Sequence, residues 1–143
     1  MNVETILRNK GSRVATIRPD ATIAEAVETL NRERIGALVV SEDGDSVDGM
    51  LSERDIVTAL AEYGADLLPR PVDEIMTRNV VTCDPADTVQ ELMAEMTNRR
   101  FRHFPVVKDG RLCGIVSIGD LVKNRLDEVE FEANSLRSFI AGG

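Results

Sequence analysis

The sequence is poor in the residues that build catalytic centres. It contains one histidine, two cysteines and no tryptophan, and aromatic residues make up 3% of its 143 positions. Cys83 and Cys113 form no Cys-x-x-Cys pair and have no histidine at metal-ligand spacing, so neither a zinc site nor a disulfide is expected. Nucleophilic catalysis needs a base beside the nucleophile, which a single histidine hardly supplies. We therefore expect a protein without catalytic activity, with free thiols in a reducing cytoplasm.

Positive charge is also scarce. The chain carries 17 lysines and arginines against 25 acidic residues, a net charge of −8. A nucleic-acid surface or an anionic membrane surface would need a clustered basic face, so neither partner is expected. Long apolar runs are missing as well, and the first residues show no signal-peptide pattern.

What the chain does have is an internal repeat. The pattern Gly-x-x-Ser-x-x-Asp occurs at residues 49–55 and again at residues 114–120. Before each copy come a short strand that ends near a proline, an amphipathic helix, an apolar strand and a turn with glycine. After each copy another helical pattern begins. This order predicts an α/β (α+β) fold of two tandem β-α-β-β-α units, each of which covers an apolar sheet face of the other.

The predicted elements correspond closely in the two halves. Short strands are expected at residues 14–17 and 80–83, and apolar strands at Ala37–Val40 and at residues 104–107. Capping boxes at Thr22 and Thr88 start the intervening helices. We place the first unit at residues 1–65 and the second at residues 66–126, with residues 63–71 as a Gly- and Pro-containing linker.

The C-terminal extension, residues 127–143, continues the last helix. Apolar side chains recur at alternating steps of four and three residues, which forms a heptad-like seam. The seam consists of Val122, Leu126, Val129, Ala133, Leu136 and Ile140. It could dock on its own unit, but its length favours contact with a partner.

The Ser and Asp of each repeated pattern have two interpretations. Ser-x-x-Asp is a common helix capping box. A helix N-terminus also favours phosphate, and a carboxylate one turn further on could accept both hydrogen bonds of a ribose diol. The duplication of the pattern favours a shared ligand site.

In this order, the repeated features resemble a pair of cystathionine-β-synthase (CBS) domains, together called a Bateman module. The resemblance covers residues 3–126 and rests on the early strands, the apolar strands and the two Gly-x-x-Ser-x-x-Asp patterns. It implies a pseudo-twofold module with two equivalent clefts between three-stranded sheets. It also implies pairing into a homodimer and binding of an adenine nucleotide: AMP, ADP, ATP, NAD(H) or S-adenosylmethionine.

The resemblance assigns roles to individual residues. Asp55 and Asp120 would hold the ribose hydroxyls, while Ser52 and Ser117 would face ribose or phosphate. The adenine would lie against the other repeat, which implies Val80, Val81, Arg102 and His103 around Asp55 and Val14, Ala15, Gly36 and Ala37 around Asp120. Arg54 and Gly119 occupy the same position in the two patterns and make the two clefts unlike.

A basic cluster surrounds the one histidine. Arg99, Arg100 and Arg102 flank His103 in an otherwise acidic chain, which favours phosphate contact for Arg102 and His103. The alternatives are a structural histidine and a solvated helix end. We expect AMP in the Asp55 cleft and an extended dinucleotide such as NAD(H) in the Asp120 cleft. If His103 contacts the phosphate, the affinity for the nucleotide should rise as the pH falls from about 7.5 to 6.

Two functions follow from these patterns. The first is a regulatory module that binds an adenine nucleotide and acts on an effector protein that the sequence leaves unknown. The alternative is an interaction scaffold, in which the C-terminal helix and the dimer surface bind a partner protein and the nucleotide site is vestigial.

Overall fold

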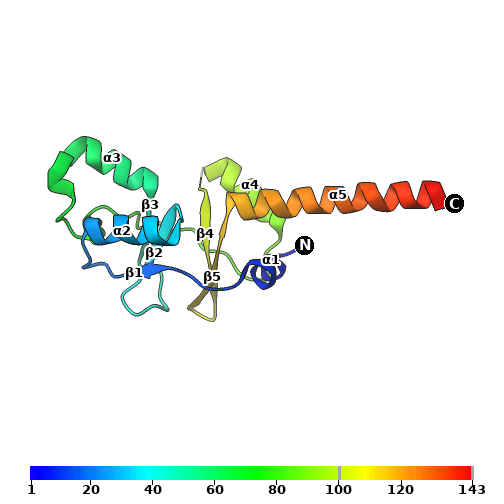
Figure 1. The fold of residues 1–143 in the computed structure, drawn as a ribbon. Helices are drawn as coiled ribbons and strands as arrows, with labels where there is room; N and C mark the ends of the chain where they lie inside the picture. The colour runs from blue at the N-terminus through cyan, green and yellow to red at the C-terminus, as the bar shows by residue number, and fades with distance from the viewer. Residues whose placement is uncertain (100, 143) are drawn as a thin grey trace.

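The two halves of the sequence fold into two α/β units followed by a long helix, as the computed structural model shows for residues 1–99 and 101–142 (Figure 1). The elements of the first half are α1 (Val3–Lys10), β1 (Thr16–Ile17), α2 (Ile23–Glu33), β2 (Ala37–Val40), β3 (Gly49–Ser52) and α3 (Glu53–Tyr63). Two 3₁₀ helices follow, η1 (Gly64–Leu67) and η2 (Val72–Glu74). The elements of the second half are α4 (Val89–Arg99), β4 (His103–Lys108), β5 (Arg111–Ser117) and α5 (Ile118–Gly142).

Side-chain caps set the starts of the helices. Thr22 accepts a hydrogen bond from the Glu25 backbone N–H at 3.2 Å, and the Glu25 carboxylate accepts one from the Thr22 backbone N–H at 3.0 Å. Thr88 and Glu91 repeat the arrangement, with distances of 3.1 and 3.5 Å. These reciprocal bonds satisfy backbone donors that have no partner within the helix. Both predicted capping boxes are confirmed.

The sheets differ between the two units. In the first unit β2 pairs with β3 in antiparallel register and with β1 in parallel register. In the second unit the hairpin β4–β5 turns at Asp109 and Gly110, whose φ values are 53° and 76°. Residue 83 adds only an isolated parallel bridge, between Cys83 and Val106.

The predicted strand at residues 80–83 is therefore wrong, and Pro105 gives the reason. In the first unit the Val39 N–H donates to the Ala15 carbonyl at 3.4 Å and the Ser41 N–H to the Ile17 carbonyl at 2.9 Å. In the second unit the Val107 N–H donates to the Cys83 carbonyl at 2.9 Å, but Pro105 stands at the position of Val39. Proline has no N–H to donate, so the ladder cannot extend toward Val81.

The two hydrophobic cores exchange their flanking segments. The side chains of α1 (Val3, Ile6 and Leu7) are buried in the core of the second unit, and the Val3 N–H donates to the Asp87 carbonyl at 3.0 Å. Leu67, Val72 and Met76 are buried in the core of the first unit. Residues 63–71 thus also contribute to the first core, since Leu67 is buried in it and Tyr63 packs against it.

A third apolar cluster joins the units. Ala37, Val39 and Met50 of the first sheet are buried there, and Val80, Leu112 and Ile115 of the second half pack against them. The Leu112 N–H donates to the Asp45 carbonyl at 2.7 Å, which links the two hairpins. In each unit, one apolar face of the sheet packs against the other unit, as predicted.

Helix α5 leaves the body of the molecule. Its first turns bury Leu121 and Asn124, and the rest projects into solvent beyond the second unit (Figure 1). None of the described helices combines the length and the apolar character needed to cross a bilayer.

Candidate functional site

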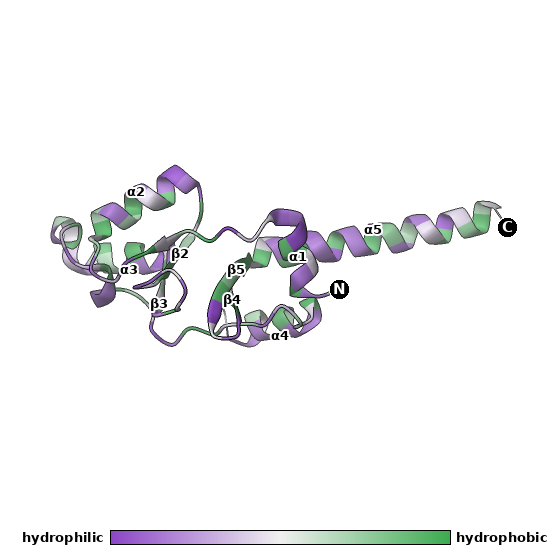
Figure 2. Ribbon diagram, turned by 90° about the horizontal axis from the view of Figure 1, so that it is seen from below, coloured by the Kyte–Doolittle hydropathy of each residue, from purple (hydrophilic) through white to green (hydrophobic). Residues whose placement is uncertain are grey.

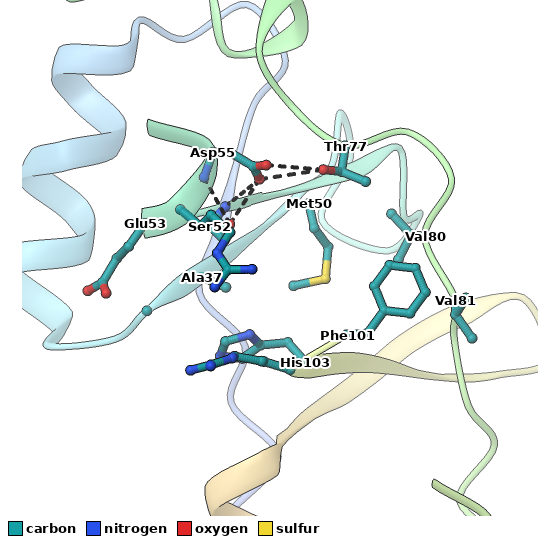
Figure 3. Close-up of a pocket in the computed structure, with 13 residues that line it drawn as sticks. Ala37, Met50, Ser52, Glu53, Asp55, Thr77, Val80, Val81, Phe101 and His103 are labelled. Atoms are coloured by element: carbon teal, nitrogen blue, oxygen red, sulfur yellow. Dashed lines mark hydrogen bonds between the residues drawn. The ribbon is translucent and has the colours of Figure 1, made fainter. Parts of the chain in front are cut away.

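A cleft lies between the two units. It encloses about 330 Å³ and lies between the β3–α3 junction of the first unit and the start of β4 in the second (Figure 3). Its size is in the range typical of small-ligand sites. It is lined by Gly36, Ala37, Met50, Ser52, Glu53, Arg54, Asp55, Thr77, Val80, Val81, Phe101, Arg102 and His103.

Asp55 caps α3 with one of its two carboxylate oxygens. Asp55 Oδ2 accepts hydrogen bonds from the Ser52 N–H at 2.9 Å and the Ser52 hydroxyl at 3.0 Å, while Ser52 Oγ accepts the Asp55 N–H at 3.2 Å. The other oxygen, Oδ1, meets the Thr77 hydroxyl at 3.3 Å. Capping and ligand binding are therefore compatible, because each oxygen of a carboxylate accepts more than one hydrogen bond.

The rest of the lining includes an apolar group, a basic group and one further carboxylate, that of Glu53. Val80, Val81 and Phe101 stand together on one side of the cleft (Figure 3), and Met50 adds a further apolar side chain to the lining. An aromatic face beside aliphatic side chains suits a flat heterocycle. Arg54, Arg102 and His103 add positive or protonatable groups, which suit an anion.

His103 lies between the two copies of the repeated pattern. It pairs with Ser117 across β4 and β5, and its Cε1 would be 3.9 Å from a Cβ atom built on Gly36. Burial lowers the pKa of His103 below its usual value; Lys10 and Arg102 add to this, whereas Asp120 and Glu53 oppose it. The imidazole is therefore neutral near pH 7 in the free protein.

We expect His103 to make the stability of the free protein depend on pH below about 6.5. A histidine of the unfolded chain binds a proton more readily than buried His103, so the free energy of unfolding falls as the pH drops through this range. Urea denaturation at pH 7.5 and 5.5 should show a smaller loss in His103→Gln than in the wild type. The same loss in both proteins would contradict the assignment, since all other titrating groups are shared.

In the second copy of the pattern, the carboxylate of Asp120 forms an ion pair with a lysine. Ser117 and Asp120 form the same cap, with the Ser117 N–H donating to Asp120 Oδ2 at 2.8 Å. The same oxygen pairs with Lys10 Nζ at 2.7 Å, and Lys10 also donates to the Ile115 carbonyl at 3.0 Å. Burial opposes ionisation of Asp120, but hydrogen bonds from Lys10 and Ser117 hold its pKa below the usual value. A ribose diol at Asp120 would have to compete with this ion pair.

The structure brings together most of the predicted site residues, but not in two equal sets. Ser52, Arg54, Asp55, Val80, Val81, Arg102 and His103 all line the cleft. Gly36 and Ala37 line the same cleft, although we expected them around Asp120. The reason is that β2 pairs with β3, so the start of β2 lies opposite Ser52.

The remaining predicted residues lie elsewhere. Val14 packs in the cluster between the units, and Ala15 packs on the core of the first unit. Gly119 is in the first turn of α5, beside Ser117. Arg99 pairs with Glu95 of its own helix at 3.0 Å, and Arg100 lies outside the described residues. Arg99 thus behaves as part of a solvated helix end.

Sequence reasoning missed four residues of the cleft: Met50, Glu53, Thr77 and Phe101. Phe101 carried a usable signal, because aromatic residues are rare in this chain and this one adjoins the basic cluster. Thr77 carried none, since its contact with Asp55 depends on how the connecting segment packs against β3, where the Thr77 N–H donates to the Met50 carbonyl at 2.8 Å.

Metal-binding groups do not gather in the part of the chain that the structure describes. Among residues 1–99 and 101–142, no three His, Cys, Asp or Glu side chains lie close enough to hold an ion. Cys83 and Cys113 are both free thiols, and burial raises the pKa of Cys83 to about 12.

Comparison with known proteins identifies the repeat. The pattern that defines the CBS domain matches residues 6–62 and 72–127. The mitochondrial CBS domain-containing protein CBSX3 of Arabidopsis thaliana is 35% identical over 128 residues, which are 87% of this chain and 62% of that protein. The chain thus spans under two thirds of that relative.

Solved structures agree with this match. The crystal structure of a CBS-domain-containing protein from Agrobacterium tumefaciens has a TM-score of 0.82 and 49% sequence identity, covering 87% of this chain and 98% of that one. The CBS domain pair of protein MJ0100, solved in complex with 5′-methylthioadenosine and S-adenosyl-L-methionine, has a TM-score of 0.78 and 28% identity, covering 90% of this chain and 98% of that one.

Proposed function

The chain belongs to the CBS-domain family, and from this we propose that it is a regulatory module that binds an adenine nucleotide in the Asp55 cleft and catalyses no reaction. Binding between the two units would change how they contact each other or an effector protein. A solved relative holds two adenosine derivatives, which supports a ligand of this class.

The observation that carries the proposal is the combination of groups in one cleft. Asp55 presents Oδ1 beside the Thr77 hydroxyl, where a ribose diol could donate its hydrogen bonds. Phe101, Val80 and Val81 offer an apolar surface for the adenine ring. Arg54, Arg102 and His103 complete the set at the place where a phosphate would need positive charge.

Among adenine ligands we propose AMP. The cationic groups of the cleft favour a phosphate ester over a neutral or cationic adenosine derivative, and one small cleft suits one phosphate. ADP, ATP and NAD(H) share the adenosine part and would bind more weakly. If His103 contacts the phosphate, protonation strengthens the contact, so affinity should rise as the pH falls; burial of His103 shifts this range below the one expected from the sequence.

A thermal-shift panel tests this function. The full chain would be heated with AMP, ADP, ATP, NAD(H) or S-adenosylmethionine, with GMP as the control. At about 100 times its Kd a ligand stabilises the folded state by about 2.7 kcal/mol, which should raise Tm by about 6–10 °C in a chain of this size. If every adenine ligand gave the same Tm as GMP, the interaction scaffold would be the better assignment.

The remaining partner that we propose is a second copy of the chain. Exposed apolar side chains on α3 (Val57 and Leu60) and at the start of α5 (Val122 and Leu126) support a homodimer, because exposure of such side chains in a monomer is costly.

A further inference from the structure

The free part of α5 carries an apolar seam that faces away from its own unit, and Phe131 and Phe139, exposed by 72% and 77%, lie outside this seam. Five of the six seam residues are large apolar side chains, and their exposed fractions are 42% for Val122, 63% for Leu126, 46% for Val129, 60% for Leu136 and 70% for Ile140. The sixth is Ala133.

The buried residues of α5 lie on the opposite face. Leu121 and Asn124 are the helix residues that are buried against the second unit, where Asn124 donates to the Met1 sulfur. In heptad terms the seam takes positions a and d, while Asn124 takes position f, half a turn away. The seam residues are therefore exposed in the single chain, on a helix that extends away from the two units (Figure 2).

Charged residues border the seam, and their order lets the charges of one helix face opposite charges of an identical parallel helix. Positions g carry Arg125, Glu132 and Phe139, and positions e carry Lys123, Glu130 and Arg137. In a parallel pair of helices each g residue faces the e residue five positions further along the other helix. Arg125 then meets Glu130 of the other copy, and Glu132 meets Arg137 of the other copy, so both contacts join opposite charges.

The antiparallel alternative joins like charges. If Leu126 packed against the other copy's Leu136, Glu130 would face Glu130 and Glu132 would face Glu132. Lys123 would face Arg137. Like charges across such a seam are destabilising. The charged border residues thus favour the parallel over the antiparallel orientation of the two helices. The apolar seam alone would allow both orientations.

We propose that residues 122–140 of α5 bind the same segment of a second copy as a parallel, in-register, two-stranded coiled coil. This places the two second units side by side. It rests on the homodimer proposed above, with which it shares Val122 and Leu126, and it is independent of nucleotide binding, since no residue of the Asp55 cleft takes part.

Cysteine trapping tests the orientation in the full chain without any nucleotide. In a parallel, in-register coiled coil each d residue lies against its own copy, so Leu136→Cys should give a disulfide-linked dimer under mild oxidation. Ser138→Cys is the matched control, because position f points away from the seam. Wild-type chain under the same oxidation accounts for Cys83 and Cys113. Equal linkage of the two variants, or linkage of Leu136→Cys only when mixed with Leu126→Cys, would overturn the proposal.

Charge reversal tests the border pairs by sedimentation equilibrium. Glu132→Arg should weaken dimerisation by about tenfold, because twofold symmetry turns two attractive contacts into repulsive ones. Adding Arg137→Glu to the same chain should restore it. Glu132 and Arg137 are five residues apart on one helix and do not contact each other there, so the restoration has to arise between chains. A wild-type monomer at all micromolar concentrations, or a double variant no better than the single one, would also overturn the proposal.

Discussion

Replacing Asp55 by alanine should lower the affinity for AMP by about 100-fold or more while the chain remains folded. A hydrogen bond to a charged group contributes about 1.5–3 kcal/mol, and the carboxylate is expected to accept one from each ribose hydroxyl. Asp55 also caps α3, where it accepts the Ser52 N–H and hydroxyl. Loss of such a cap costs about 0.5–2 kcal/mol, which a domain of this size tolerates. Isothermal titration calorimetry of both proteins measures the difference.

Asp120→Ala is the matched control for this prediction. It removes the same type of cap, between Asp120 and Ser117, from the other unit. Because Lys10 already pairs with the Asp120 carboxylate at 2.7 Å, this variant should bind AMP within about twofold of the wild type. Equal losses in the two variants would point to two equivalent sites, and wild-type binding by Asp55→Ala would leave Asp55 with capping alone.

The second large effect is expected at Gly49. A Cβ atom at this position would lie 2.7 Å from the Met76 sulfur and 2.8 Å from the Thr77 carbonyl oxygen. The sulfur can move, but the carbonyl accepts the Met50 N–H at 2.9 Å and belongs to the backbone that positions the Thr77 hydroxyl. Such overpacking costs about 1–3 kcal/mol, so Gly49→Ala should lower Tm by about 3–10 °C. AMP affinity should fall with it.

Gly119→Ala serves as the comparison for Gly49→Ala. A Cβ atom at Gly119 would meet only the Ser117 hydroxyl, at an ordinary contact distance of 3.5 Å. Alanine is also the better helix former, by up to about 1 kcal/mol, so this variant should be as stable as the wild type or more so. If both variants melted at the wild-type temperature, this would contradict the close packing of residues 76–77 on β3.

Much of the fold could be predicted because its signals are local. The capping boxes at Thr22 and Thr88, the apolar β2 and the β4–β5 turn depend on residues within a few positions of each other. Their repetition also led to the CBS family, which the matches to residues 6–62 and 72–127 confirm. The strand at residues 80–83 failed because Pro105, beside the single bridged residue Val106, has no N–H to extend the ladder, and an isolated strand pattern does not reveal which backbone donors its neighbour lacks.

The candidate site was predictable where it rests on the repeat and not where it rests on packing. Asp55, Arg102 and His103 line one cleft, as the resemblance implied, although their binding role stays a prediction. The contact of Lys10 with Asp120 joins residues 110 positions apart, and no local sequence pattern predicts it. It follows from α1 packing on the second unit, which a comparison of the two halves by sequence cannot show.

The exchange of flanking segments between the two cores has a consequence for cooperativity. Because α1 completes the second core, residues 67–76 complete the first and a third cluster joins the units, neither core is built from one half of the sequence alone. Local unfolding of one unit exposes apolar side chains from both halves of the sequence, so intermediates with one unit folded are costly. A ligand held between the units should then stabilise the entire chain by linkage, and we expect it to slow amide hydrogen exchange as far away as α1 and the base of α5.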